Sequence, residues 1–133
     1  MIDFKKRLSI LAQILISNPG IGKAAIMKFL FFLQKVYKLP LGYNFSIYTY
    51  GPYSSEVFED IDFASHEGFL TASIETYGNG IYGYNIMPTD KSKVLVDEKQ
   101  DFIDLYMDSI KEVLFLFKNK NAKQLELYST IVY

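Results

Sequence analysis

The sequence contains no cysteine and a single histidine, His66. Without cysteine the chain can form neither a disulfide nor a thiolate metal site, which fits the reducing cytoplasm. One histidine is also too few for the usual zinc sites. No stretch has about 18 uninterrupted apolar residues, so we expect no membrane-spanning helix. These absences predict a cytoplasmic protein that holds no metal and no other cofactor.

Lysine and arginine are missing from the middle of the chain. All 14 of them lie outside the run from Leu39 to Asp90, although the net charge of the whole chain is only -1. The run instead carries carboxylates and most of the tyrosines: Glu56, Glu59, Asp60, Asp62, Glu67, Glu75, Asp90, Tyr43, Tyr48, Tyr50, Tyr53, Tyr77, Tyr82 and Tyr84. The sequence is therefore electrically two-sided.

The length and apolar content predict one domain. A chain of 133 residues that is 50% hydrophobic can bury one core but is short for two. Apolar residues at helical spacing predict a first helix over residues 1–17 and a second, apolar on most sides, over residues 23–38. We expect a single domain over residues 1–133, with a core over 1–89 and a helical extension over 90–133.

A strand, a turn and an amphipathic helix are expected next. Alternating residues predict a strand over 45–50, and Gly51-Pro52 is typical of a turn. Ser54 or Ser55 is a good N-cap, and Gly68 is placed to end the helix. One face would be buried (Val57, Phe58, Ile61, Ala64), and the other would present carboxylates with Phe63 among them.

Asn79-Gly80 predicts a type I′ hairpin between strands over residues 71–77 and 81–87. With these two as the turn residues, Tyr77 would lie opposite Tyr82 and Glu75 opposite Tyr84. A long helix is expected over residues 97–117, followed by a last helix after Asn121. The apolar ending Ile131-Val132-Tyr133 would pack within the chain or against a second copy, so a homo-oligomer stays open.

This order of elements predicts an α+β, mainly α, fold: a winged helix-turn-helix-like domain with a β-hairpin wing and two added C-terminal helices. The third helix occupies the place that usually contacts DNA.

The segment over residues 20–89 resembles the YwgA-like family of small bacterial and archaeal proteins. More remotely, it is similar to the Panacea (SocA-like) domain of antitoxins and proteolytic adaptors. The resemblance is carried by Lys23-x-x-x-Met27-Lys28, Phe45-x-x-Tyr48-x-Tyr50-Gly51-Pro52-Tyr53-Ser54, Glu67-Gly68-Phe69-Leu70 and Tyr84-x-Ile86-x-x-Thr89. It implies a winged-helix-like fold and no known enzymatic activity.

Catalytic motifs find little support, and we expect no enzyme. Gly20-Ile21-Gly22-Lys23 lacks the remaining residues of a phosphate-binding loop. Glu56 and Asp60 lie one helical turn apart but, facing outward, would lack the pocket that separates two carboxyl pKa values. Ser54 and Ser55 lack the sequence motif of a catalytic serine and matching His and Asp partners, so we interpret them as helix caps.

The distribution of charge predicts a protein partner with a basic surface. Carboxylates on the third helix would repel phosphates, so nucleic acid is disfavoured. The predicted protein-binding residues are Glu56, Glu59, Asp60, Asp62, Phe63, Glu67, Tyr77, Tyr82 and Tyr84, although Tyr43, Tyr50 and Tyr53 could equally be core residues. The alternative is a DNA-binding regulator that uses the basic residues of the first two helices: Lys5, Lys6, Arg7, Lys23, Lys28, Lys35 and Lys38.

Overall fold

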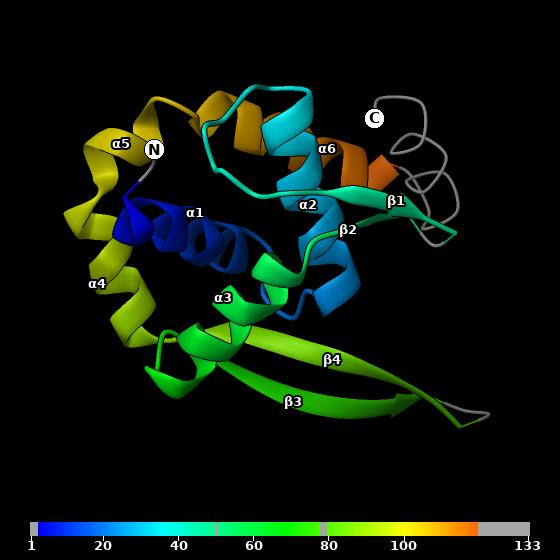
Figure 1. Ribbon diagram of the computed structural model, residues 1–133. Coiled ribbons are helices and arrows are strands. Elements are labelled where there is room, and N and C mark those ends of the chain that lie inside the picture. The colour runs from blue at the N-terminus through cyan, green and yellow to red at the C-terminus, as the bar shows by residue number, and fades with distance from the viewer. Residues whose placement is uncertain (1–2, 50, 78–79, 120–133) are drawn as a thin grey trace.

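The computed structural model describes residues 3–49, 51–77 and 80–119, and in these residues it is α+β and mainly helical. The elements are α1 (Phe4–Ser17), α2 (Lys23–Lys35), β1 (Ser46–Tyr48), β2 (Gly51–Tyr53), α3 (Ser55–His66), β3 (Leu70–Tyr77), β4 (Ile81–Pro88), α4 (Asp90–Glu98), α5 (Gln100–Asp104) and α6 (Met107–Asn119). Each hairpin, β1–β2 and β3–β4, is an antiparallel two-stranded sheet (Figure 1). The predicted class, α+β and mainly α, is confirmed.

The first two helices provide most of the core. The Asp3 side chain caps α1 by accepting a hydrogen bond from the Lys5 backbone N–H, 2.8 Å away. The predicted burial of the second helix is confirmed, because eight consecutive residues of α2, Ile26 to Leu33, are buried. This helix ends at Lys35, three residues before the predicted end, and Lys38 then takes a positive φ of 61°.

A short ribbon, β1–β2, replaces the predicted strand and turn. Ile47 pairs with Pro52 and Tyr48 with Gly51, so Gly51-Pro52 forms a strand and the predicted turn at this position is wrong. Gly51 adopts a φ of 112°, which favours glycine, and a proline is tolerated because both strands of a two-stranded ribbon are edge strands. Three-residue strands are too short to show a period, which is why the sequence did not reveal the second strand.

The longer hairpin, β3–β4, has a register that differs by one residue from the prediction. Tyr77 pairs with Ile81, Glu75 with Gly83 and Ile74 with Tyr84. The predicted pairs Tyr77–Tyr82 and Glu75–Tyr84 are therefore wrong. The strands are joined by residues 78–80 rather than by two turn residues, and Gly80 has a φ of 73°.

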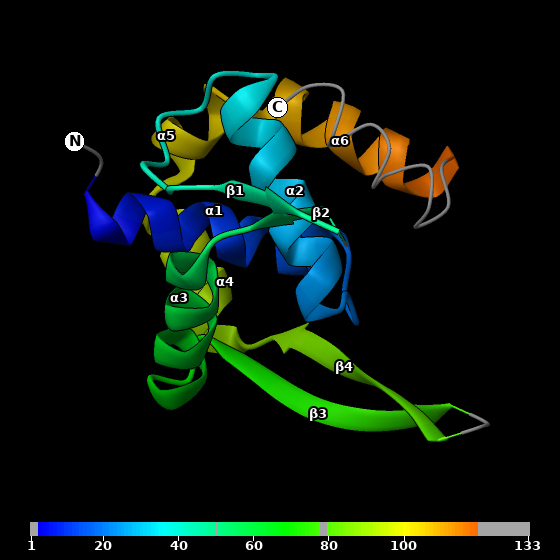
Figure 2. The same ribbon diagram turned by 45° about the vertical axis from the view of Figure 1, so that its right-hand side comes forward.

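This hairpin is anchored at its base and projects from the helices (Figure 2). Ile86 is buried, and its backbone exchanges hydrogen bonds with the loop after α1: Gly20 N–H donates to the Ile86 carbonyl at 2.9 Å, and Ile86 N–H donates to the Ile21 carbonyl at 3.2 Å. Farther out, residues 71–76 are exposed on both faces of the ribbon. The outer part of the hairpin is thus available for contacts.

The helix predicted over residues 97–117 is wrong, because the chain forms three helices there, beginning earlier at Asp90. A capping box starts α4: the Thr89 hydroxyl accepts from Ser92 N–H, and the Ser92 hydroxyl accepts from Thr89 N–H. The chain then changes direction, since α4 and α5 pack on α1 whereas α6 packs on α2. The predicted last helix lies outside the described residues.

Buried residues from α1 to α6 form one hydrophobic cluster, which includes Phe29, Phe31 and Phe32 of α2 and also Leu95, Ile110 and Val113 beyond residue 89. Within the described ranges, we find no helix with both the length and the apolar character that crossing a bilayer requires.

Candidate functional site

The helix α3 buries one face and exposes another. Val57, Ile61 and Ala64 are buried, as the spacing predicted. Asp60 is also buried, with 6% of its surface exposed, so its predicted position on the outer acidic face is wrong. The physical reason is a partner far away in the sequence, Arg7 of α1.

Asp60 sits at the centre of a buried polar network. Arg7 Nε lies 2.9 Å from Asp60 Oδ2, and Arg7 Nη2 donates to Oδ1 at 3.1 Å. The Tyr43 hydroxyl donates to Oδ2 at 2.5 Å, while the Arg7 guanidinium lies over the Tyr43 ring, 4.5 Å from its centroid. Burial, and then the Asp60 carboxylate, raise the pKa of the Tyr43 phenol well above its usual value. Two predicted surface residues therefore join α1 to α3 instead.

Three predicted carboxylates remain exposed: Glu59, Asp62 and Glu67, which we call the acidic ridge. None of the three has an ion-pair partner among the described residues. Glu56 is half-buried and accepts a hydrogen bond from the Asn44 backbone N–H at 2.8 Å. The solvent-facing charge of α3 is acidic, but it comes from fewer residues than the sequence predicted.

Phe63 forms one wall of a hollow beside the acidic ridge. Its ring is 42% exposed and packs edge-to-face on Phe4, with centroids 5.1 Å apart. The hollow has a volume of about 310 Å³, and its lining is apolar apart from two lysines and a glutamate: Phe4, Lys5, Leu8, Phe63, Phe69, Lys91, Val94, Leu95 and Glu98. Phe63 is thus a partly covered aromatic wall and not an isolated protruding ring.

The long hairpin adds exposed apolar side chains. Ile74 is 65% exposed, and Tyr84, which pairs with it across the strands, is 41% exposed. Met87 on the same strand as Tyr84 is also exposed. The side chains of Tyr77 and Tyr82, both predicted binding residues, lie outside the described part of the structure.

The basic residues of the DNA alternative lie on or just beyond two helices, and several of them have contacts within the chain. Arg7 is paired with Asp60, and Lys28 is buried with 8% of its surface exposed. Lys23 Nζ lies over the Tyr84 ring, 4.1 Å from its centroid. The others, Lys5, Lys6, Lys35 and Lys38, lie at the start of α1 and at or just beyond the end of α2. Because α2 has 13 residues, its two ends are about 18 Å apart.

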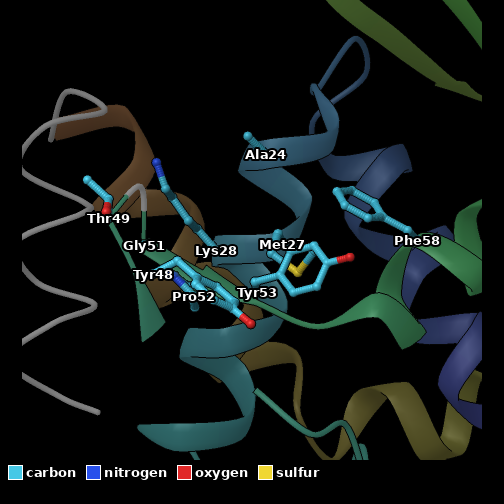
Figure 3. Close-up of a pocket in the computed structure, with 9 residues that line it drawn as sticks. All are labelled: Ala24, Met27, Lys28, Tyr48, Thr49, Gly51, Pro52, Tyr53 and Phe58. Carbon is cyan, nitrogen blue, oxygen red and sulfur yellow. The ribbon is translucent and has the colours of Figure 1, made fainter. Parts of the chain in front are cut away.

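An apolar groove between α2, the β1–β2 ribbon and α3 was missed by sequence reasoning (Figure 3). This aromatic groove has a volume of about 580 Å³ and is lined by Ala24, Met27, Lys28, Tyr48, Thr49, Gly51, Pro52, Tyr53 and Phe58. Three rings form an edge-to-face ladder along it: Tyr48 to Tyr53 at 5.7 Å and Tyr53 to Phe58 at 5.6 Å. The Tyr-Gly-Pro-Tyr run was the available signal, but Gly51-Pro52 was interpreted as a turn and not as a second strand.

The tyrosines near these surfaces divide between core and surface. Tyr43 is buried, Tyr53 is 40% exposed, and Tyr50 lies outside the described residues. Ser54 lies behind the groove wall, where its backbone N–H points at Met27 Sδ, 3.3 Å away. Its hydroxyl is buried and has no hydrogen-bond partner in the described part of the chain.

The described residues offer no group of three or more His, Asp or Glu side chains arranged to hold a metal ion. Glu56 and Asp60, the paired carboxylates, point to different partners, Asn44 and Arg7. His66 is exposed at the end of α3.

No protein-family model matches the chain. The chain is similar to the uncharacterised protein YwgA of Bacillus subtilis (strain 168), with 28% identity over 117 residues, which make up 88% of this chain and 67% of that protein. Several residues that carry the resemblance stated above, among them Met27, Lys28, Tyr48, Pro52 and Tyr53, line the aromatic groove. The similarity over most of the chain supports its place in a YwgA-like family.

Proposed function

We propose that the protein is a non-enzymatic interaction module with a winged-helix-like fold that binds a protein partner through α3 and the β3–β4 hairpin. The order of elements supports this fold: two helices, a short ribbon, a third helix and a projecting hairpin. In this arrangement α3 takes the place of the recognition helix and β3–β4 the place of the wing.

The observation that carries the proposal is the chemistry of the exposed surface. No side chain of the acidic ridge forms an ion pair with a described residue, although the Lys91 ammonium donates to the Glu67 backbone carbonyl at 2.6 Å; the described part of the hairpin contains no Lys or Arg. A duplex carries one phosphate charge per about 1.7 Å of its axis, so this surface would repel it. A basic protein surface would instead be attracted, and Ile74 would supply apolar contact area, whereas the Lys23 ammonium lies over the Tyr84 ring.

The hollow beside Phe63 gives such a partner a place to insert an apolar side chain. A few side chains that fill well-packed pockets near the centre of an interface commonly contribute most of its binding energy. An antitoxin, an adaptor or a regulator would work in this way, and the remote resemblance to the Panacea domain implies the same class of activity.

The test is recovery of partners from cells that contain the protein, with tagged wild type and an Asp62→Lys/Phe63→Ala variant. We expect wild type to recover at least one basic protein that the variant loses. Asp60 is not a suitable target, because replacing it would break the pair with Arg7 and disturb the fold. A Lys93→Ala variant, changed at an exposed position of α4, is the matched control. Equal recovery by wild type and the Asp62→Lys/Phe63→Ala variant would refute the proposal.

A further inference from the structure

The aromatic groove is separate from the acidic ridge and has the opposite charge character. Its lining includes one charged residue, Lys28, and no carboxylate among the described residues. Lys23 stands at its rim, since its Nζ lies 5.8 Å from the centroid of the Phe58 ring that lines the groove. A cation thus borders an apolar hollow on the α2 side.

The positive charge of Lys23 is not paired with a carboxylate of any described residue. Its ammonium lies 4.1 Å from the centroid of the Tyr84 ring and 5.8 Å from that of the Phe58 ring, and the ring faces attract the cation. Held in place by two rings, the ammonium is preorganised to meet an anion at the mouth of the groove.

The groove walls favour an apolar side chain. Met27, Pro52 and the ring ladder present apolar surface, and the volume of about 580 Å³ lies within the range of ligand pockets. Tyr48 is 60% exposed and Tyr53 is 40% exposed, so the ring faces extend beyond the hollow. An occupant attached to a peptide backbone would cover these outer ring faces as well as fill the hollow.

We propose that the aromatic groove binds a linear segment of a partner protein in which one large apolar side chain is flanked by carboxylates. The apolar side chain enters between α2 and the ribbon, and a flanking carboxylate meets Lys23. This inference goes beyond the proposed function, because it assigns a second surface with the opposite charge preference.

The test uses defined probes: short Gly-Ser peptides that carry one central Phe flanked by Glu, by Gln or by Lys. Binding is followed by NMR of protein labelled with ¹³C at the methionine methyl groups. Met27 lines the groove, whereas Met107 in α6 does not and serves as the internal reference. We expect a saturable shift of Met27 alone, with the Glu peptide binding roughly two- to fivefold more tightly than the Gln peptide, as one exposed ion pair allows.

Two variants make the location and the charge preference falsifiable. Ala24 is exposed and lines the groove, so Ala24→Phe fills the groove without removing a core contact. This variant should bind the Glu peptide about tenfold more weakly, or weaker still. Lys23→Glu should reverse the order, so that the Lys peptide binds more tightly than the Glu peptide. Glutamate is well tolerated there because Lys23 is the first residue of α2, where the helix dipole favours an anion.

The Lys93→Glu variant, which changes the charge by the same amount on exposed α4, should leave the order of the three peptides unchanged. The inference is overturned by the absence of a saturable Met27 shift with the Glu peptide, by equal or tighter binding of the Lys peptide to wild type, or by unchanged binding to Ala24→Phe. The peptide experiments use variants of Ala24 and Lys23, whereas the test of the proposed function uses Asp62 and Phe63. Failure of one proposal can therefore be told apart from failure of the other.

Discussion

Arg7 and Asp60 lie 53 residues apart in the sequence and form a buried ion pair in which Arg7 Nη2 donates to Asp60 Oδ1 at 3.1 Å. The pair joins the start of α1 to the middle of α3, and the Tyr43 hydroxyl donates a further hydrogen bond to the same carboxylate. The pair therefore links α3 to α1 in addition to the apolar contacts of Val57, Ile61 and Ala64 with the core. Asp60 is accordingly buried, while Glu59, Asp62 and Glu67 face solvent.

Replacing Asp60 should destabilise the fold. In Asp60→Asn the guanidinium of Arg7 loses its charged partner, and we expect the free energy of unfolding to fall by roughly 3 kcal/mol, near the lower end for a broken buried pair. The lower end applies because the Arg7 side chain keeps 18% of its surface exposed. Urea denaturation measures the change. The matched control is Asp62→Asn on the exposed face, which should change stability by less than about 0.5 kcal/mol; equal effects of the two substitutions would contradict the network.

The raised pKa of Tyr43 predicts a loss of stability at high pH. Above the usual tyrosine pKa of about 10, the unfolded chain loses the phenolic proton while the folded protein retains it. The folded state then binds more protons, so the free energy of unfolding falls as pH rises from about 10 toward the raised folded value.

The comparison of wild type with Tyr43→Phe between pH 8 and pH 11 isolates this contribution. The variant should show a shallower decline than wild type above about pH 10. A residual decline is expected, because burial and a hydrogen bond with Glu112 raise the pKa of Tyr37 to about 12. Parallel curves for the two proteins would show that Tyr43 does not titrate differently in the folded state.

Gly20 should be needed to anchor the long hairpin. Its φ is 87°, and a Cβ at this position would lie 2.8 Å from Asn85 Oδ1 of β4. We expect Gly20→Ala to lower the free energy of unfolding by roughly 2 kcal/mol, through the strain of the positive φ and displacement of the Asn85 side chain. Gly80→Ala is the control, since Gly80 also has a positive φ but faces open space, and it should cost about 1 kcal/mol. Thermal denaturation of both variants gives the comparison.

Duplex DNA should not bind the protein measurably at physiological salt. The basic residues of the alternative function are divided between the start of α1 and the two ends of α2, and Arg7 already has an acidic partner. Fluorescence anisotropy with a labelled mixed-sequence duplex tests this at several salt concentrations. Salt-dependent binding that Lys35→Glu and Lys38→Glu abolish would instead support a DNA-binding regulator.

The sequence was sufficient to predict the helices in which apolar residues recur at helical spacing over several turns. The spacing of apolar residues predicted α1, α2 and the buried face of α3, because each helix packs one stripe against the same core. It also predicted the hairpin after α3, since Gly68 ends the helix and the two strands flank residues 78–80. These features depend on neighbours within the same element.

Features that depend on distant partners were not accessible from spacing. Asp60 lies at the edge between the polar and apolar faces of α3, and only Arg7 and Tyr43 explain why it is buried. The division of the C-terminal region at Lys99 and Leu105 follows from packing on two different helices, α1 and α2. The aromatic groove requires the ribbon β1–β2, which joins a strand that was predicted to one that was not.

The most direct test of the central claim is quantitative recovery of partner proteins by wild type, Asp62→Lys/Phe63→Ala and the control Lys93→Ala, with each variant first shown to have wild-type stability. We expect wild type and Lys93→Ala to recover a basic protein in equal amounts, and Asp62→Lys/Phe63→Ala to lose it. Recovery of the same proteins in the same amounts by all three would contradict it.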